Sequence, residues 1–578
     1  MERTIHWLKA ASAMLLMVAF EAAGQEINEP RATFFAPLDV PLVSVDVFVF
    51  DTGGRPVPGL TREDFDVFED GNRVEVSHFY ASPGIAARAE RSGQTTAAEF
   101  SDQGPDQDLY LVVYFDDTNL NRGNRQAAIE HLRSFFSTEL PLEMRVMVVR
   151  YDGRNIVQQP FTEENTEVLA ALDSVDDAAS LSREIDEGRL LREIEMAASL
   201  AAISGRMSDK LMETSGRTLW GSIETYVNQT VHRIRTGIEN QKRLIGSLSG
   251  LSGRKAIVLV SDGVEARPGE ALYRTWSQTF GGVPIFRTDA HRAFLQASRN
   301  DLSNDFDDLA RCANGRRVSF YTLSPAGTAR VRAVSAESRL MDDEGLTIDQ
   351  GLSAEVLMAH MAGTTGGRPL VNSSALAEQL DQVSEELSNY YSLAFEPEHV
   401  GDGKYHRLEV DVKRSGLRIR HREGYVDVSP SQRMEDRTLA AAMHGISDNP
   451  LGISVANSGE TVRRDDGTLL VPVIVTVPLK QLVLIPSEDE HQGRISIHLM
   501  VCDRRGDLSQ PIRREYPVAI PNASLADALG KSAGFTMRLA VRPGWQRIAV
   551  GLRDEVSLTE STTVLEVEVG GSDGMESR

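Results

Sequence analysis

The sequence predicts an α/β protein whose main element is a doubly wound, mostly parallel sheet, with an N-terminal β module before it and an all-β sandwich after it. Residues 109–115 and 256–260 are continuous apolar runs that end in a polar turn, which is typical of parallel strands buried on both faces. Strands alternate with helical patterns in this region, which indicates βαβ units. Beyond residue 430, short strands separated by Asp-Gly, Gly-Asp and Pro-Gly turns favour a sandwich.

Length, charge and motif content limit the possible functions. A chain of 578 residues exceeds what one core supports, so several domains are expected. The net charge of −23 argues against nucleic acid as a partner. The sequence has no Gly-x-Ser-x-Gly, His-Glu-x-x-His or Cys-x-x-Cys motif, and its twelve histidines show no metal-ligand spacing. We therefore expect no enzymatic activity.

The N-terminus has the features of a secretory signal peptide. Arg3 and Lys9 precede an apolar stretch at 10–20, and small residues at 22–24 offer a cleavage site before Gln25. A transmembrane anchor needs about 18 apolar residues, which this stretch does not reach. We predict that residues 1–24 are removed and that the mature protein, without a later membrane span, is secreted or periplasmic.

Residues 40–80 predict a small β module. Valines alternate along 43–49, and 65–76 reads as strand, Asp-Gly turn and strand, which indicates a β-hairpin. The module is short for an independent domain, so it is expected to pack on a neighbour. Residues 81–108 show no periodicity and predict a linker or mobile loop.

The central domain is predicted at 109–428. Its strands at 109–115, 144–149, 254–260 and 318–323 are joined by helices, of which the first covers 125–136. Residues 163–250 are mostly helical, and the part from about 175 to 250 reads as an insertion that is interrupted at 216–219. A β appendix at 390–428 completes the domain.

The C-terminal sandwich is predicted at 435–572. Six segments have strand character and lie at short spacing: 468–477, 494–502, 512–520, 535–541, 546–552 and 562–569.

Residues 40–428 resemble a von Willebrand factor type A (VWA) domain protein, and more narrowly the secreted bacterial "VWFA-related" family. The resemblance depends on the order and spacing of several motifs. These are VSVDVFVFDTGG at 43–54, LYLVVYFDD at 109–117, GRTLW at 216–220, GRKAIVLVSDG at 253–263, VSFYTLSP at 318–325, TTGG at 364–367, and the strands at 389–397 and 405–425.

The resemblance implies a metal-ion-dependent adhesion site that holds Mg²⁺ or Mn²⁺ among oxygen ligands. The family pattern is Asp-x-Ser-x-Ser after the first strand, a Thr on a middle loop and an Asp after a later strand. Asp116, Thr118, Thr218 and Asp262 match these positions. Leu120 falls where the second hydroxyl belongs, so the match is partial.

Two alternatives for these residues stay open. A frame shifted by one residue would use Asp117, Asn119 and Asn121, which all carry side-chain oxygens. Alternatively, Asp116, Asp117 and Asp262 are ordinary turn and helix-cap residues.

The expected function is protein–protein interaction or adhesion at the upper edge of the central sheet, with or without a divalent cation. One alternative is an exported hydrolase or carbohydrate-binding protein that acts through the C-terminal sandwich, where Trp545 and Phe535 are the candidate aromatic residues. Another is a structural scaffold whose metal site is inactive.

Overall fold

The computed structural model describes residues 42–91, 108–137, 144–177, 185–203, 208–325, 348–371 and 376–570. The predicted signal peptide lies outside these ranges, as do residues 92–107 of the predicted linker. The chain divides into two units. One comprises Val40–Leu248 and Ser252–Val428, and the other consists mainly of Ser429–Arg578.

A six-stranded sheet forms the centre of the first unit, in the order β10-β9-β8-β5-β6-β7. Its strands are β5 (Leu109–Asp116), β6 (Met144–Tyr151), β7 (Asn155–Thr162), β8 (Arg254–Val260), β9 (Val318–Ser324) and β10 (Pro369–Val371). Every neighbouring pair is parallel except β6 and β7, which run antiparallel. The prediction of a mostly parallel sheet is confirmed.

Helices cover both faces of this sheet. All eight residues of β5 are buried, and alternate ones pack with apolar side chains of α2 (Arg122–Phe136), α3 (Asn165–Asp177) and α11 (Leu376–Ser388) in one core. On the other face, α5 (Ser208–Leu248) lies against β6, because a Cβ on Gly237 would sit 3.5 Å from the ring of Tyr151. Burial on both faces explains why the strand sequences are continuously apolar rather than alternating.

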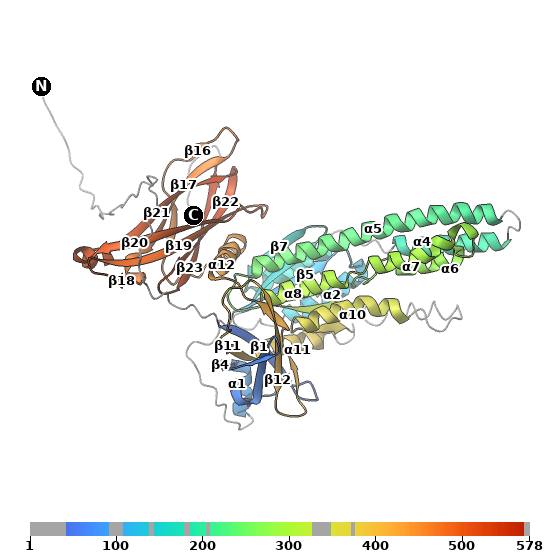
Figure 1. The fold of residues 1–578 in the computed structure, drawn as a ribbon, viewed down its shortest axis with the longest axis horizontal. Helices are drawn as coiled ribbons and strands as arrows, with labels where there is room; N and C mark the ends of the chain where they lie inside the picture. Colours follow the sequence, from blue (N-terminus) through green and yellow to red (C-terminus); the bar gives the residue numbers. More distant parts are fainter. Residues whose placement is uncertain are drawn as a thin grey trace. The chain divides into compact units, whose positions relative to one another are not determined.

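Four helices pack together as an arm, namely α4 (Ile185–Ile203), α5, α6 (Glu270–Phe280) and α7 (Arg287–Arg299) (Figure 1). The predicted interruption at 216–219 is wrong, because α5 is one helix of 41 residues. Gly216 serves close packing instead: a Cβ there would lie 2.6 Å from the Phe286 ring, and Trp276 Nε1 donates to its carbonyl at 2.9 Å. Among the described helices, none combines the length and the apolar character needed to cross a membrane.

The N-terminal strands and the predicted β appendix form a single β module. One sheet has the order β13-β1-β11-β4 and the other the order β14-β12-β2-β3. The strands are β1 (Val43–Phe50), β2 (Phe65–Glu69), β3 (Asn72–Val74), β4 (Val76–Ala81), β11 (Tyr391–Phe395), β12 (Tyr405–Val412), β13 (Arg418–Arg420) and β14 (Gly424–Val426). Strands from both ends of the unit thus share one core. The predicted module at 40–80 thus packs on a neighbour as expected, and that neighbour is the β appendix at 390–428.

A short helix, α1 (Pro83–Arg91), occupies the first part of the predicted linker. Ile85, Ala86 and Ala89 are buried, so one helical face packs on the module. Ser82 fixes the start, since its hydroxyl donates to the carbonyl of Ser388 at 2.9 Å. The linker prediction is therefore wrong for residues 83–91.

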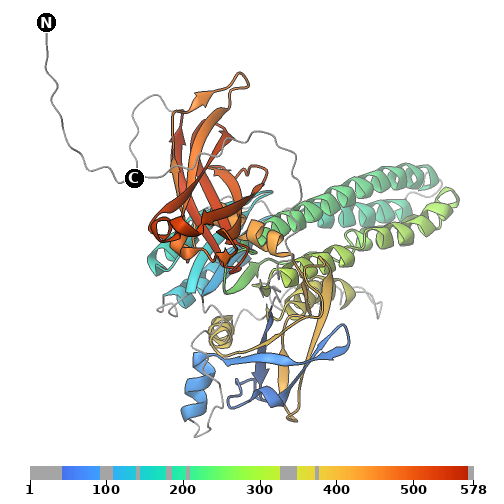
Figure 2. The ribbon, with the colours of Figure 1, turned by 60° about the vertical axis from the view of Figure 1, so that its left-hand side comes forward.

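The second unit is the predicted sandwich, preceded by a helix (Figure 2, orange to red). Its main strands are β17 (Leu469–Pro478), β19 (Glu490–Asp503), β20 (Ile512–Pro521), β21 (Ser532–Val541), β22 (Gly544–Asp554) and β23 (Glu560–Val569), and they confirm all six predicted strands. Three short strands complete the sheets, namely β15 (Ser454–Asn457), β16 (Val462–Arg463) and β18 (Ile485–Pro486). Sheet β15-β17-β16, with β21 also paired to β17, faces sheet β18-β19-β22-β23, with β20 also paired to β19, across one core. The helix α12 (Pro430–His444) packs alanines on the outer face of β19 and β22.

Candidate functional site

The carboxyl ends of β5 and β8 lie side by side at the centre of the parallel sheet. The chain passes from β5 to β6 and β7 on one side, and then returns to β8 on the other side. Such a reversal of strand order is where open α/β sheets bind ligands. Asp116 ends β5 and Asp262 follows β8, so the structure brings these two predicted residues to one place, which we call the upper edge.

Asp116 is the most central carboxylate of the upper edge and is 6% exposed. Thr118 Oγ1 donates to its Oδ1 at 2.7 Å, and Asn119 Nδ2 donates to its Oδ2 at 2.8 Å. Burial raises the pKa of Asp116, while the hydrogen bonds from Asn119 and Thr118 oppose this rise. The charge of Arg233, on α5, also lowers the pKa of Asp116.

Asp262 connects β8 to the start of α2. Its Oδ2 accepts from the backbone N and from the Nδ2 of Asn121, at 2.8 and 2.9 Å, and its Oδ1 accepts from Asn124 Nδ2 at 2.6 Å. Asn121 is also the N-cap of α2, since its Oδ1 accepts from the backbone N of Asn124. Gly263 follows with φ of 81°, which lets the chain turn sharply after the carboxylate.

Asp117 takes part in a buried ion-pair network instead. Arg125 Nη1 lies 3.3 Å from its Oδ1 and Arg150 Nη1 lies 3.1 Å from its Oδ2, while its own side chain is 0% exposed. The pKa of Asp117 is raised because of burial, and the two arginines offset only part of this rise. Guanidinium groups thereby occupy both carboxylate oxygens of Asp117. This rules out the alternative set of metal ligands that would begin at Asp117.

Thr218 does not lie at the upper edge. It is exposed within α5, and its hydroxyl donates to the carbonyl of Thr214 at 3.0 Å, as is usual for a threonine inside a helix. Fifteen residues separate it from Arg233 on the same helix, which is about 22 Å along the axis. What α5 contributes near Asp116 is therefore the positive charge of Arg233 and not the predicted hydroxyl group.

The donor set of the upper edge fits a hard cation in part. Asp116 Oδ1 and Thr118 Oγ1 lie 2.7 Å apart, close to the roughly 2.9 Å between adjacent oxygens around octahedral Mg²⁺. Ser261 adds a hydroxyl 3.4 Å from Asp116 Oδ2. Oxygen donors thus come from two of the three loops that the resemblance implies.

A second group of potential metal ligands lies in the β module. One ligand atom from each of Glu69, His399 and His406 lies within 4.8 Å of the others. The His399 and His406 rings stack at 3.8 Å, and their Nδ1 atoms lie 2.9 and 2.8 Å from Asp427 and Asp70, respectively. Sequence reasoning missed this cluster because strand pairing, rather than residue spacing, brings its members together.

Comparisons with known proteins find only distant likeness. No family model and no curated protein matches the chain. Similar solved structures include BatB from Bacteroides thetaiotaomicron, described as a conserved hypothetical protein, with 11% identity over 48% of this chain and 98% of that chain and a TM-score of 0.22. Three N-terminal domains of the type V pili tip protein Mfa5 from Porphyromonas gingivalis have 9% identity over 91% and 77%, with a TM-score of 0.23.

Manganese-loaded TRAP protein from Plasmodium vivax has 7% identity over 55% of this chain and 95% of that chain, with a TM-score of 0.20. TM-scores this low assign neither a family nor a function to the chain.

Proposed function

We propose that the chain is an exported VWA-like protein that binds another protein at the upper edge of its central sheet. The observation that carries the proposal is the convergence of Asp116, Thr118 and Asp262 at the point where strand order reverses. The mostly parallel sheet with its antiparallel β7 supports a VWA-like fold, and the N-terminal sequence supports export. The proposed role is binding and not catalysis.

The finer part of the proposal concerns a cation. We propose that Asp116, Thr118 and Asp262 hold Mg²⁺ or Mn²⁺, and that a carboxylate of the partner completes its coordination. The spacing of Asp116 and Thr118 supports this, and the oxygen-only donor set suits these ions. The partner surface is therefore expected to be acidic.

Calorimetric titration of Mn²⁺ and Mg²⁺ into the mature chain tests the cation. We expect saturable binding that weakens at least tenfold in Asp262→Ala and in Thr118→Val. Thr218→Val is the matched control, since it removes the same hydroxyl from an exposed helical position. His399→Gln separates the upper edge from the β-module cluster, and it should leave Mg²⁺ binding intact. Absence of binding at millimolar metal would refute the cation part.

Site-specific photocrosslinking tests the binding surface itself. A photoreactive residue at position 264, in the loop after β8, should form a crosslink to a partner protein when the chain is expressed in the cells that naturally produce it. The same residue at Leu508, which is 42% exposed on the sandwich, should not. Crosslinks from position 508 alone would favour the C-terminal sandwich as the working surface.

A further inference from the structure

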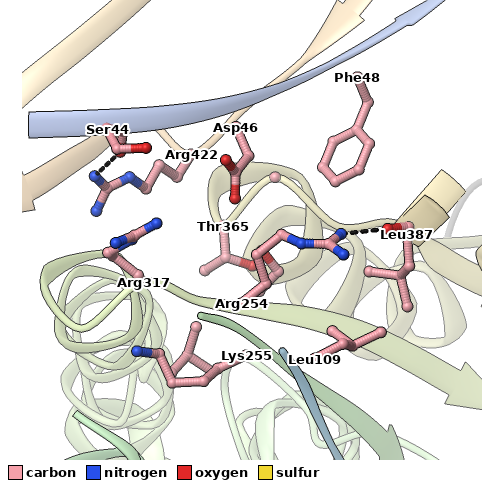
Figure 3. Close-up of a pocket in the computed structure, with 13 residues that line it drawn as sticks. Ser44, Asp46, Phe48, Leu109, Arg254, Lys255, Arg317, Thr365, Leu387 and Arg422 are labelled. Atoms are coloured by element: carbon pink, nitrogen blue, oxygen red, sulfur yellow. Dashed lines mark hydrogen bonds between the residues drawn. The ribbon is translucent and has the colours of Figure 1, made fainter. Parts of the chain in front are cut away.

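A small cavity of about 40 Å³ lies at the opposite edge of the central sheet, between that sheet and β1 of the β module (Figure 3). Arg254 and Lys255 come from the start of β8, Arg317 directly precedes β9, and Arg422 lies between β13 and β14. Asp46 of β1 is the one carboxylate among the lining residues. Figure 3 shows Arg317 and Arg422 next to one another on one side and Arg254 on the other.

The arginines of this cavity are not neutralised by carboxylates. Arg422 donates to the carbonyl oxygens of Asn314 and Ser44, at 3.0 and 2.7 Å. Arg254 donates to the carbonyl of Leu387 and lies over the Tyr390 ring at 4.0 Å. Within the described part of the chain, no ion pair joins Arg254, Arg317 or Arg422 to an acidic side chain.

Burial, together with the neighbouring charge of Arg317, lowers the pKa of Arg422 to about 9. The three lining arginines against the one carboxylate of Asp46 leave a formal excess of +2. Charges that are taken out of water are normally paired, so this excess calls for a counter-charge.

Arg317 is also held in an unfavourable backbone conformation. Its φ is 58°, in the left-handed region that favours glycine, two residues after the end of α8 (Ser303–Gly315). Its backbone N donates to the Asn314 carbonyl, but no partner of its half-buried guanidinium lies within the described residues. Arg317 thus combines a strained backbone with a positive charge next to that of Arg422, and neither property stabilises the fold. This combination points to a bound ligand.

We infer that this cavity binds a small tetrahedral oxyanion, phosphate or sulfate, either free or at the end of an ester. A dianion offsets the excess charge of the arginines, and guanidinium groups match the oxygens of such ions in charge and hydrogen-bond geometry. The volume admits a group of a few atoms. Because Arg254, Arg317, Arg422 and Asp46 are each only half-buried, solvent ions can reach it. The inference is independent of the function proposed for the upper edge.

The test is calorimetric titration of inorganic phosphate and sulfate into the mature chain in a buffer free of both, with sodium chloride at matched ionic strength as the reference. We expect saturable binding that Arg317→Gln weakens at least tenfold. Arg316→Gln is the matched control, because it removes the same charge one residue away, from a guanidinium that contacts Cys312. Binding no stronger than that of chloride, or equal loss in both variants, would overturn the inference.

Arg317→Gly gives a second readout that does not depend on calorimetry. Glycine relieves the backbone strain and the repulsion of Arg422, so the thermal unfolding midpoint should rise in anion-free buffer. The further rise that phosphate causes in the wild type should disappear. A variant that keeps the phosphate response would contradict the inference. Phenyl phosphate that binds as tightly as phosphate identifies an ester end as the ligand, whereas binding of inorganic phosphate alone identifies the free ion.

Discussion

The two edges of the central sheet bury charges of opposite sign and compensate them differently. At the upper edge, Asp116, Asp117 and Asp262 accept hydrogen bonds from amides, a hydroxyl and two arginines. At the lower edge, Arg422 donates to carbonyls, and Arg317 lies next to it. The charged partners of Asp117 lie within the chain and stabilise the fold, whereas Arg422 donates only to carbonyls, which indicates a counter-charge from outside the chain. Substitutions that remove one partner of a buried charge, followed by measurement of the unfolding free energy, test this difference.

The largest effect is expected for Asp117→Asn. The substitution keeps the side-chain shape but removes the carboxylate that lies 3.3 Å from Arg125, which is 1% exposed, whereas Arg150 keeps its ion pair with Asp152. Removing one partner of a buried ion pair costs about 3–5 kcal/mol of unfolding free energy. Urea denaturation of the mature chain, from which Trp7 is removed, in a Trp545→Phe background measures it, because Trp220 and Trp276 then report on the first unit alone.

Asp173→Asn is the control for this measurement. Asp173 pairs with Arg133 on the surface, where its side chain is 64% exposed, so the change should cost under about 0.5 kcal/mol. Equal costs for the two variants would mean that the network around Asp117 is not structural.

A smaller effect on the unfolding free energy is expected for His498. Unlike a buried arginine, a buried histidine can lose its proton and therefore its charge. His498 lies on β19, and burial, with Arg513 and Arg553 nearby, lowers its pKa to about 4. Between pH 6.5 and pH 4 the unfolded chain therefore binds a proton that the folded chain does not. The stability of the sandwich should fall by about 2 kcal/mol as pH drops through this window, after allowance for solvent screening.

Calorimetric unfolding at pH 7 and pH 4.5 measures this loss. His498→Gln should remove most of the pH dependence, whereas His491→Gln, on the same strand, should retain it. If the two variants respond alike, His498 does not cause the effect.

The smallest effect is expected for Asn121→Ala at the upper edge. It removes the N-cap of α2 and one donor to Asp262, which should cost about 1 kcal/mol. Asn124→Ala removes only the side-chain donor to Asp262, so it should cost less. The same urea denaturation compares them, and a larger loss for Asn124→Ala would contradict the capping role of Asn121.

Local pattern was sufficient wherever a strand is buried or alternates regularly. The parallel strands β5 and β8 and the six strands of the sandwich were predicted from apolar runs, period-two alternation and turn residues. The meeting of Asp116 and Asp262 also followed, because parallel strands with carboxyl ends at one edge bring together whatever follows them.

Features that depend on distant residues could not be predicted in this way. Thr218 lies in a pattern that looked interrupted, but the rings packed against Gly216 keep α5 continuous. The β module pairs strands from the two ends of the first unit, and this pairing also assembles the His399 and His406 cluster. The cationic cavity has no sequence signal, since its arginines come from three separate segments.

The central position of β1 in its sheet has a consequence for the order of folding. β1 pairs with β11 on one side and with β13 on the other, and Val45 opposes Leu393. At about 5–20 residues per second, a ribosome needs roughly 20–70 s to make the chain between those two residues. Throughout that interval β1 has neither neighbour, so its sheet cannot form. A leading segment that cannot complete its native sheet remains unfolded, which is the state in which a chain can be threaded through a membrane.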